Sequence, residues 1–154
     1  MGYYSRTFYP VYEPKTFITS SYSGNLGYAF PTAIGAKVAN PDKAVVALSG
    51  DGGFLFNSQE LATAVQHGIN VVVVLFNDNA YGNVLRDQVN RFNGRAIGAE
   101  LKNPDFMKLA EAYGARGVRV QGAERLEAAI REALAIDATS LIEVPVEMMP
   151  TPFE

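Results

Sequence analysis

The sequence contains no cysteine, no tryptophan and a single histidine among its 154 residues. The absence of cysteine excludes a disulfide scaffold, a thiolate metal site and a cysteine nucleophile. With His67 as the one histidine, a zinc site built from several histidines is excluded, and serine–histidine catalysis would depend on that residue alone. The function therefore has to be sought in other side chains and in the backbone.

Positive charge is also scarce, because 13 Lys and Arg stand against 16 Asp and Glu and the net charge is −3. No basic run occurs, so the footprint of a nucleic-acid-binding protein is missing. The longest strongly apolar run, Val71–Phe76, is far shorter than the roughly 20 residues of a membrane helix. Since no charged-then-apolar leader opens the chain, we expect a cytoplasmic protein without a membrane segment.

The length favours one domain, and we expect residues 1–154 to form a single unit. Nine aromatic side chains fall within the first 30 positions, among prolines and glycines that interrupt any regular period. We therefore expect residues 1–23 to form an irregular, aromatic-rich N-terminal arm. Two interpretations stay open: an arm that packs on its own domain, or a surface that another chain or domain covers, since aromatic residues are enriched in interface cores.

After the arm, short apolar runs alternate with segments typical of helices. The runs that predict buried strands are Ala44–Ser49, Val71–Phe76, Gly117–Val120 and Leu141–Val146. Helices are expected over 31–40, 58–67, 103–113 and 124–134. The second of them is expected to open with a capping box formed by Asn57 and Glu60. This alternation predicts an α/β fold, a doubly wound, mostly parallel sheet with helices on both faces.

Two loops at the carboxyl ends of predicted strands carry the best candidates for ligand-binding residues, because ligands of open α/β sheets bind at those ends. The first loop is Ser-Gly-Asp-Gly-Gly at 49–53, and the second is Asn-Asp-Asn-Ala-Tyr-Gly at 77–82. Glycines let backbone N–H groups approach a phosphate at the start of a helix. A dinucleotide site with Asp78 on a ribose is one interpretation, although the first loop lacks the G-x-G-x-x-G pattern.

Asp51, inside the glycine loop, determines what a bound phosphate would require. The N-terminus of a helix stabilises a nearby anion by about 0.3–1 kcal/mol. Two like charges about 4 Å apart, by contrast, repel each other by about 4 kcal/mol at an effective dielectric near 20. A diphosphate beside Asp51 is therefore favourable when a cation lies between them, and Asp78 adds a second carboxylate. Carboxylate, carbonyl and phosphate oxygens suit Mg²⁺ or Ca²⁺ rather than zinc.

The two loops also resemble those of a known family. Gly50-Asp51-Gly52, followed 27 residues after Asp51 by Asp78 within Asn77-Asp78-Asn79, resembles the thiamine-diphosphate motif of acetolactate synthases and 2-oxoacid decarboxylases. The glycine-rich segment 24–36 resembles that family's approach to the aminopyrimidine ring of the cofactor. The likeness runs from Gly24 to Val146 and implies a C-terminal pyrophosphate-type domain that binds thiamine diphosphate and Mg²⁺, in an enzyme that acts on 2-oxo acids.

The resemblance gives roles to individual residues. It implies that Asp51, Asp78 and the carbonyl oxygen of Ala80 bind Mg²⁺. The residues that it implies in cofactor binding are Gly24, Asn25, Leu26, Gly50, Gly52, Gly53, Tyr81 and Gly82. Among these, the Gly24 carbonyl would accept from the 4′-amino group, and Leu26 would hold the cofactor in its bent shape. The family usually has Asn at the position of Asp78, so the extra negative charge here should strengthen the demand for a cation.

The resemblance also indicates what the chain does not supply. Members of the family are several times longer, and a pyrimidine-binding domain, usually from another subunit, provides the Glu that activates the cofactor. No Glu of this chain matches it. We therefore expect half a site that is inactive alone, needs a pyrimidine-binding domain or subunit, and belongs to a homo- or hetero-oligomer. The other hypothesis is a non-catalytic, Mg²⁺-dependent diphosphate- or dinucleotide-binding module or scaffold.

Overall fold

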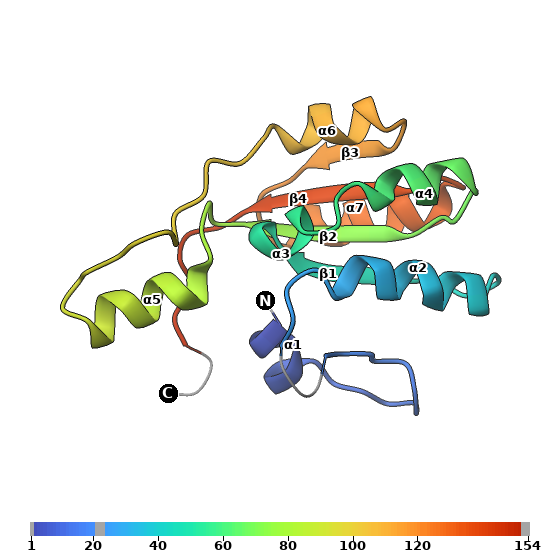
Figure 1. The fold of residues 1–154 in the computed structure, drawn as a ribbon. Helices are drawn as coiled ribbons and strands as arrows, with labels where there is room; N and C mark the ends of the chain where they lie inside the picture. The colour runs from blue at the N-terminus through green and yellow to red at the C-terminus, as the bar shows by residue number, and fades with distance from the viewer. Residues whose placement is uncertain (1, 21–23, 152–154) are drawn as a thin grey trace.

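The centre of the molecule is a sheet of four parallel strands (Figure 1). The structure is a computed structural model, which describes residues 2–20 and 24–151. The strands are β1 (Val46–Gly50), β2 (Val72–Asn77), β3 (Arg116–Arg119) and β4 (Ser140–Pro145), and they lie in the order β1-β2-β4-β3. Each neighbouring pair is parallel, so all four strands end at the same edge of the sheet. The predicted α/β fold with a mostly parallel sheet is therefore confirmed.

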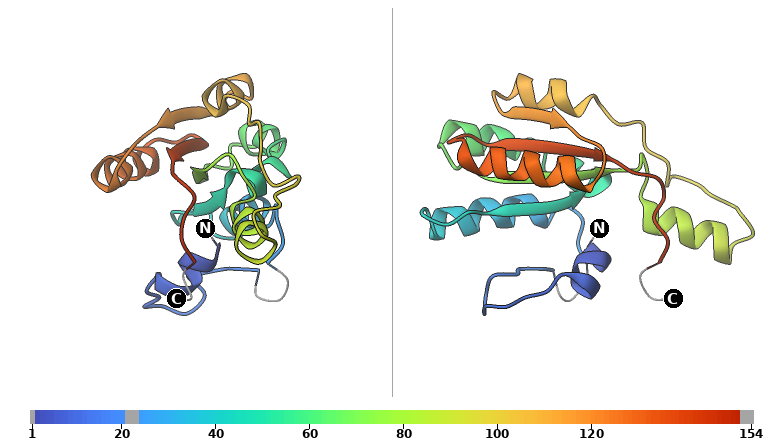
Figure 2. Two further views of the ribbon diagram at one scale, coloured as in Figure 1. Left: turned by 90° about the vertical axis from the view of Figure 1, so that its left-hand side faces the viewer. Right: turned by 180° about the vertical axis from the view of Figure 1, so that it is seen from behind.

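Helices cover both faces of this sheet (Figure 2). The helices α2 (Ala29–Ala39), α3 (Asp51–Leu55), α4 (Glu60–Gln66) and α6 (Phe106–Ala112) pack on one face, and α7 (Ala123–Ala135) packs on the other. Two more helices are α1 (Gly2–Phe8) and α5 (Gly82–Arg91). Alternation along β2 divides the core, because Val73 and Leu75 join the four-helix side whereas Val72 and Val74 join the α7 side.

The N-terminal arm is more regular than the sequence suggested. Residues 2–8 form the helix α1, so the arm is not irregular throughout, and α1 contacts β1. Tyr9 stacks on Phe17 with ring centroids 5.6 Å apart, which closes the following segment on itself. Tyr12 nevertheless remains 90% exposed. Residues 1 and 21–23 of the predicted arm lie outside the described residues.

The predicted capping box between Asn57 and Glu60 is wrong. The helix α4 starts only at Glu60, and the residue before it, Gln59, makes no side-chain cap. The Asn57 side-chain amide instead donates to the Gly27 carbonyl at 2.7 Å, and the Glu60 carboxylate accepts from the Thr63 hydroxyl at 2.7 Å. Asn57 therefore joins the start of α4 to the 24–27 loop, a contact across 30 residues that the local pattern did not indicate.

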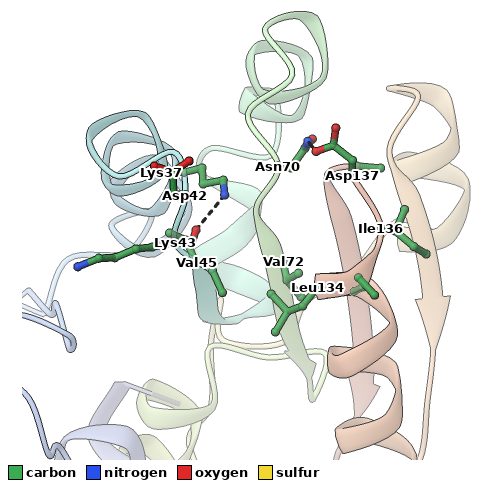
Figure 3. A pocket seen from close by; sticks show the side chains of 13 residues that line it. Lys37, Asp42, Lys43, Val45, Asn70, Val72, Leu134, Ile136 and Asp137 are labelled. Atoms are coloured by element: carbon green, nitrogen blue, oxygen red, sulfur yellow. Dashed lines mark hydrogen bonds between the residues drawn. The ribbon is translucent and has the colours of Figure 1, made fainter.

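The amino ends of the strands enclose a cavity of about 340 Å³, which we call the amino-end cavity (Figure 3). Three of its polar side chains, those of Lys37, Asn70 and Asp137, are hydrogen-bonded within the protein. The Lys37 ammonium donates to the carbonyls of Pro41 and Lys43, both at 2.8 Å, and the Asn70 amide donates to the Asp137 carboxylate. This end of the sheet thus provides an Asn–Asp pair remote from the predicted site.

Among the residues that the structure describes, no helix has both the length and the apolar character needed to cross a membrane.

Candidate functional site

The carboxyl ends of the strands enclose the larger cavity, of about 860 Å³, which we call the carboxyl-end cavity. Every site residue predicted from the sequence lines it. These residues are Gly24, Asn25, Leu26, Gly50, Asp51, Gly52, Gly53, Asp78, Ala80, Tyr81 and Gly82. They come from the loop before α2, the β1–α3 junction and the β2–α5 loop, which Figure 1 shows gathered at this end of the sheet. The fold therefore brings the predicted set together.

Asp51 is the first residue of α3 and follows β1 directly. Gly50 before it is extended, with φ −83° and ψ 162°, so the chain turns from strand to helix within one residue. The Asp51 side chain is 2% exposed, and its Oδ2 accepts a hydrogen bond from the Asn103 amide at 2.6 Å. A carboxylate buried to this degree needs polar partners or a cation.

Asp78 follows β2, and its side chain is half-buried. Burial raises the pKa of the Asp78 carboxyl above its ordinary value, and the negative charge of Asp51 raises it further. The backbone N–H of Ala80, which donates to Asp78 Oδ1 at 3.2 Å, opposes this increase. The two carboxyl groups therefore face a common space in which their charges repel each other.

Glycines allow the two loops to meet closely around these carboxyl groups. A Cβ atom on Gly52 would lie 2.5 Å from Cε1 of Tyr81 and 3.2 Å from Cδ1 of Leu101. A Cβ atom on Gly82 would overlap Oδ2 of Asp78. At Gly53 the space is less restricted, since the nearest atom, Ser49 Oγ, would be 3.4 Å from a Cβ. A side chain at position 52 or 82 would therefore have to displace the Tyr81 ring or the Asp78 carboxyl group.

The 78–82 loop is held by a short segment that follows α5. Ala80 forms an antiparallel bridge with Glu100. The backbone N–H of Tyr81 donates to the Ala99 carbonyl at 2.8 Å, and the N–H of Leu101 donates to the Asn79 carbonyl at 2.7 Å. Asn79 has a positive φ of 55°, a conformation that asparagine tolerates better than most residues. These contacts fix the backbone that carries the Ala80 carbonyl.

Four polar residues that are linked to one another by hydrogen bonds were not singled out from the sequence as site residues. Asn103 donates to Asp51 and, at 2.9 Å, to the Asn77 side-chain carbonyl. Asn77 in turn donates to Glu143 at 2.8 Å, and Glu143 accepts from Arg119 at 2.8 Å. Glu143 had a signal in the sequence, since it is a single charge inside the apolar run Leu141–Val146 and is 2% exposed.

The donor set of the cavity fits a hard, hydrated cation. It presents the carboxylates of Asp51 and Asp78, and Mg²⁺ is typically bound by one or two carboxylates while it keeps several waters. Within residues 2–20 and 24–151 no group of three or more His, Cys, Asp or Glu side chains forms a metal cluster. The buried Asn103 Oδ1 has no hydrogen-bond partner within the protein. Such an unpartnered acceptor, on a side chain whose amide donates to Asp51, suits an ordered water.

Replacing Asp78 by Asn should stabilise the cation-free chain at neutral pH. Because the folded-state pKa of Asp78 lies above its ordinary value of 3.8, its contribution to stability falls as pH rises from about 4 through that raised pKa. Asn cannot ionise, so D78N should melt about 1–3 °C above the wild type at pH 7 in chelator. The two melting curves should converge near pH 3.5. An equal difference at both pH values would contradict this cause.

Comparison with known proteins adds to this geometry. Residues 1–144 match the family described as "Thiamine pyrophosphate enzyme, C-terminal TPP binding domain". The chain is 36% identical over 148 residues to the probable acetolactate synthase large subunit of Methanococcus aeolicus, an alignment that covers 96% of this chain and 24% of that protein. It is 39% identical over 136 residues to acetolactate synthase of Bacillus subtilis, covering 88% of this chain and 24% of the relative.

A solved structure shares the fold. The thiamine diphosphate-dependent 4-hydroxybenzoylformate decarboxylase of Rhodococcus jostii RHA1 superimposes with a TM-score of 0.76 at 38% sequence identity. The match covers 82% of this chain and 24% of that one. The chain thus spans about a quarter of the length of these proteins.

Proposed function

The chain belongs to the thiamine pyrophosphate enzymes, as their C-terminal TPP-binding domain, and from that premise we propose that it binds the diphosphate of thiamine diphosphate through Mg²⁺ in the carboxyl-end cavity. The observation that carries the proposal is the convergence of all predicted site residues on this cavity, with Asp51 and Asp78 sharing one space. Without a cation the two carboxylates repel each other and would repel a diphosphate. A divalent ion bound between the carboxylates and the diphosphate relieves both repulsions.

Each loop has a separate task in this proposal. Asp51, Asp78 and the carbonyl of Ala80 hold the Mg²⁺ ion. The backbones around Gly50, Gly52, Gly53, Tyr81 and Gly82 face the diphosphate, because glycine at 52 and 82 keeps side chains out of that space. Gly24, Asn25 and Leu26 line the same cavity and would contact the remainder of the cofactor. Leu26 is 52% exposed and free to be covered by it.

Bound thiamine diphosphate would supply the chemistry by which a 2-oxo acid is decarboxylated or its acyl carbon transferred. The relatives include acetolactate synthases, a sulfoacetaldehyde acetyltransferase and a decarboxylase, and we propose the same general class for the enzyme to which this chain contributes. Since the chain spans about a quarter of such proteins, a pyrimidine-binding domain or subunit would provide the activating Glu.

Thermal unfolding with and without ligands tests the proposal. A ligand at 100 times its dissociation constant stabilises the native state by about 2.7 kcal/mol, so thiamine diphosphate with Mg²⁺ should raise the melting temperature by about 5–10 °C. Thiamine diphosphate with chelator should raise it much less, because the diphosphate then faces the carboxylates with no cation between them. Mg²⁺ alone should also raise it less, because the ion then lacks the phosphate oxygens as ligands. An equal rise with and without Mg²⁺ would contradict the metal bridge. No rise at millimolar cofactor would favour the scaffold hypothesis.

A further inference from the structure

A chain of partly buried hydrogen bonds leads from the edge strand β3 to Asp51. It begins at Arg119 on β3, whose guanidinium donates to Glu143 Oε2 at 2.8 Å. Glu143 lies on β4 directly opposite Arg119 in the register. From Glu143 the chain passes to Asn77 at the end of β2, and from Asn77 to Asn103. It ends at Asp51 Oδ2, 2.6 Å from the Asn103 amide nitrogen.

The direction of every bond in this chain follows from Glu143. An ionised carboxylate only accepts hydrogen bonds, so Asn77 must turn its Nδ2 toward Glu143, at 2.8 Å. The Asn77 Oδ1 is then directed to the site, where it accepts from the Asn103 amide and from the backbone N–H of Asn79 at 3.1 Å. Asn103 must consequently present its Nδ2, which is the group that reaches Asp51.

We infer that Asn103 is a positioning residue for Asp51, held in the donating orientation by Glu143 through Asn77. A donor on Oδ2 fixes the rotation of the Asp51 carboxyl group and leaves its other oxygen for the cation. This inference rests on the proposed function, because it concerns how the metal-binding carboxylate is aimed. Residues that orient metal ligands in this way are worth about 10- to 100-fold in metal affinity.

The surrounding contacts distinguish Asn103 from an ordinary helix-start residue. Pro104 follows it, which restricts Asn103 to extended backbone and keeps it outside α6. The helix is capped instead by Asp105, whose carboxylate accepts from the N–H groups of Met107 and Lys108. Asn103 therefore does not cap the helix, and its side-chain amide donates to Asp51 instead.

The test compares Asn103→Ala with a matched control. Asn70→Ala removes another Asn-to-Asp hydrogen bond, an exposed one to Asp137 in the amino-end cavity (Figure 3). The apparent dissociation constant of Mg²⁺ is measured from the melting temperature at saturating thiamine diphosphate. We expect a loss of at least about tenfold for Asn103→Ala and no change for Asn70→Ala. Melting in chelator reports whether each variant folds.

A double-mutant cycle provides a readout that a purely structural role would not change. Glu143→Gln keeps the side-chain size but removes the obligate acceptor, so Asn77 can turn and Mg²⁺ binding should weaken a few-fold. Once Asn103 is truncated, Glu143→Gln should have no further effect on Mg²⁺ affinity. Additive losses, or unchanged affinity in Asn103→Ala, would overturn this inference and leave the proposed function intact. Failure of the wild type to bind cofactor with Mg²⁺ would overturn both.

Discussion

Replacing Asp51 by Ala should abolish the Mg²⁺-dependent binding of thiamine diphosphate while the chain stays folded. Asp51 is the more deeply buried of the two carboxylates, at 2% exposure, and the proposed cation would bind directly to it. Removing one partner from a buried charge pair costs about 3–5 kcal/mol. Since each tenfold in affinity corresponds to about 1.4 kcal/mol, the expected loss is at least about 100-fold.

The folded state should tolerate this change for a specific reason. In the cation-free chain, Asp51 faces the negative charge of Asp78, so its removal relieves a repulsion that opposes the loss of one hydrogen bond. The Asn103 amide that donated to it keeps the Asn77 side-chain carbonyl as an acceptor at 2.9 Å. Calorimetric titration with thiamine diphosphate in excess Mg²⁺ measures the affinity, and the melting temperature in chelator reports the fold.

Asp137→Ala is the control for Asp51→Ala. Asp137 also accepts from an asparagine, Asn70, but at the opposite edge of the sheet. This variant should bind the cofactor like the wild type. Unchanged affinity in Asp51→Ala would remove Asp51 from the metal site, whereas equal losses in both variants would indicate a general effect of charge on the chain.

The fold was predictable where local sequence and tertiary packing agree. The run Val71–Phe76 is rich in β-branched residues and is buried on both faces of the sheet, so propensity and environment favour the same strand, observed as Val72–Asn77. The predicted site loops follow from the same regularity, because parallel strands all end at one edge. The sequence alone therefore predicted that Asp51 and Asp78 lie at the same edge of the sheet, while their role in binding stays a proposal.

Asn77, Asn103 and Glu143 could not be predicted in this way, because the contacts between them depend on the order of the strands in the sheet. Asn103 meets Asp51 across 52 residues, and Asn77 meets Glu143 across 66 residues. Glu143 reaches both Asn77 and Arg119 only because β4 lies between β2 and β3. Helical and strand periodicity contain no information about that order. The Asn57 error has the same origin, since its amide binds a loop 30 residues away.

Replacing Gly82 by Ala should also remove tight Mg²⁺ binding, although the substitution adds a single methyl group. The new Cβ would overlap Asp78 Oδ2, and the simplest relief is for the Asp78 carboxylate to swing out of the cavity. The site then keeps one of its two carboxylates. We expect at least about a 100-fold loss of Mg²⁺ affinity at saturating thiamine diphosphate, as for removal of the charge itself.

The stability of the Gly82→Ala variant should change in the opposite sense to its affinity. Gly82 opens α5 and is not among the glycines with positive φ, so Ala adopts this backbone without strain and favours the helix. Moving Asp78 away from Asp51 also reduces their repulsion. The cation-free variant should therefore melt at or slightly above the wild-type temperature, whereas a misfolded variant would melt below it.

Two comparisons assign the expected loss in Gly82→Ala to Asp78. Gly35→Ala, within α2, places a methyl where no other atom lies within 4 Å, so it should stabilise the chain by about 0.5–1 kcal/mol and leave Mg²⁺ affinity unchanged. In an Asp78→Ala background the overlap no longer exists, and Gly82→Ala should then cost no further affinity. A full additional loss in that background would mean that Gly82 acts through its own backbone rather than through Asp78. That outcome would make the glycine, and not the carboxylate beside it, the determinant of cofactor binding in the second loop.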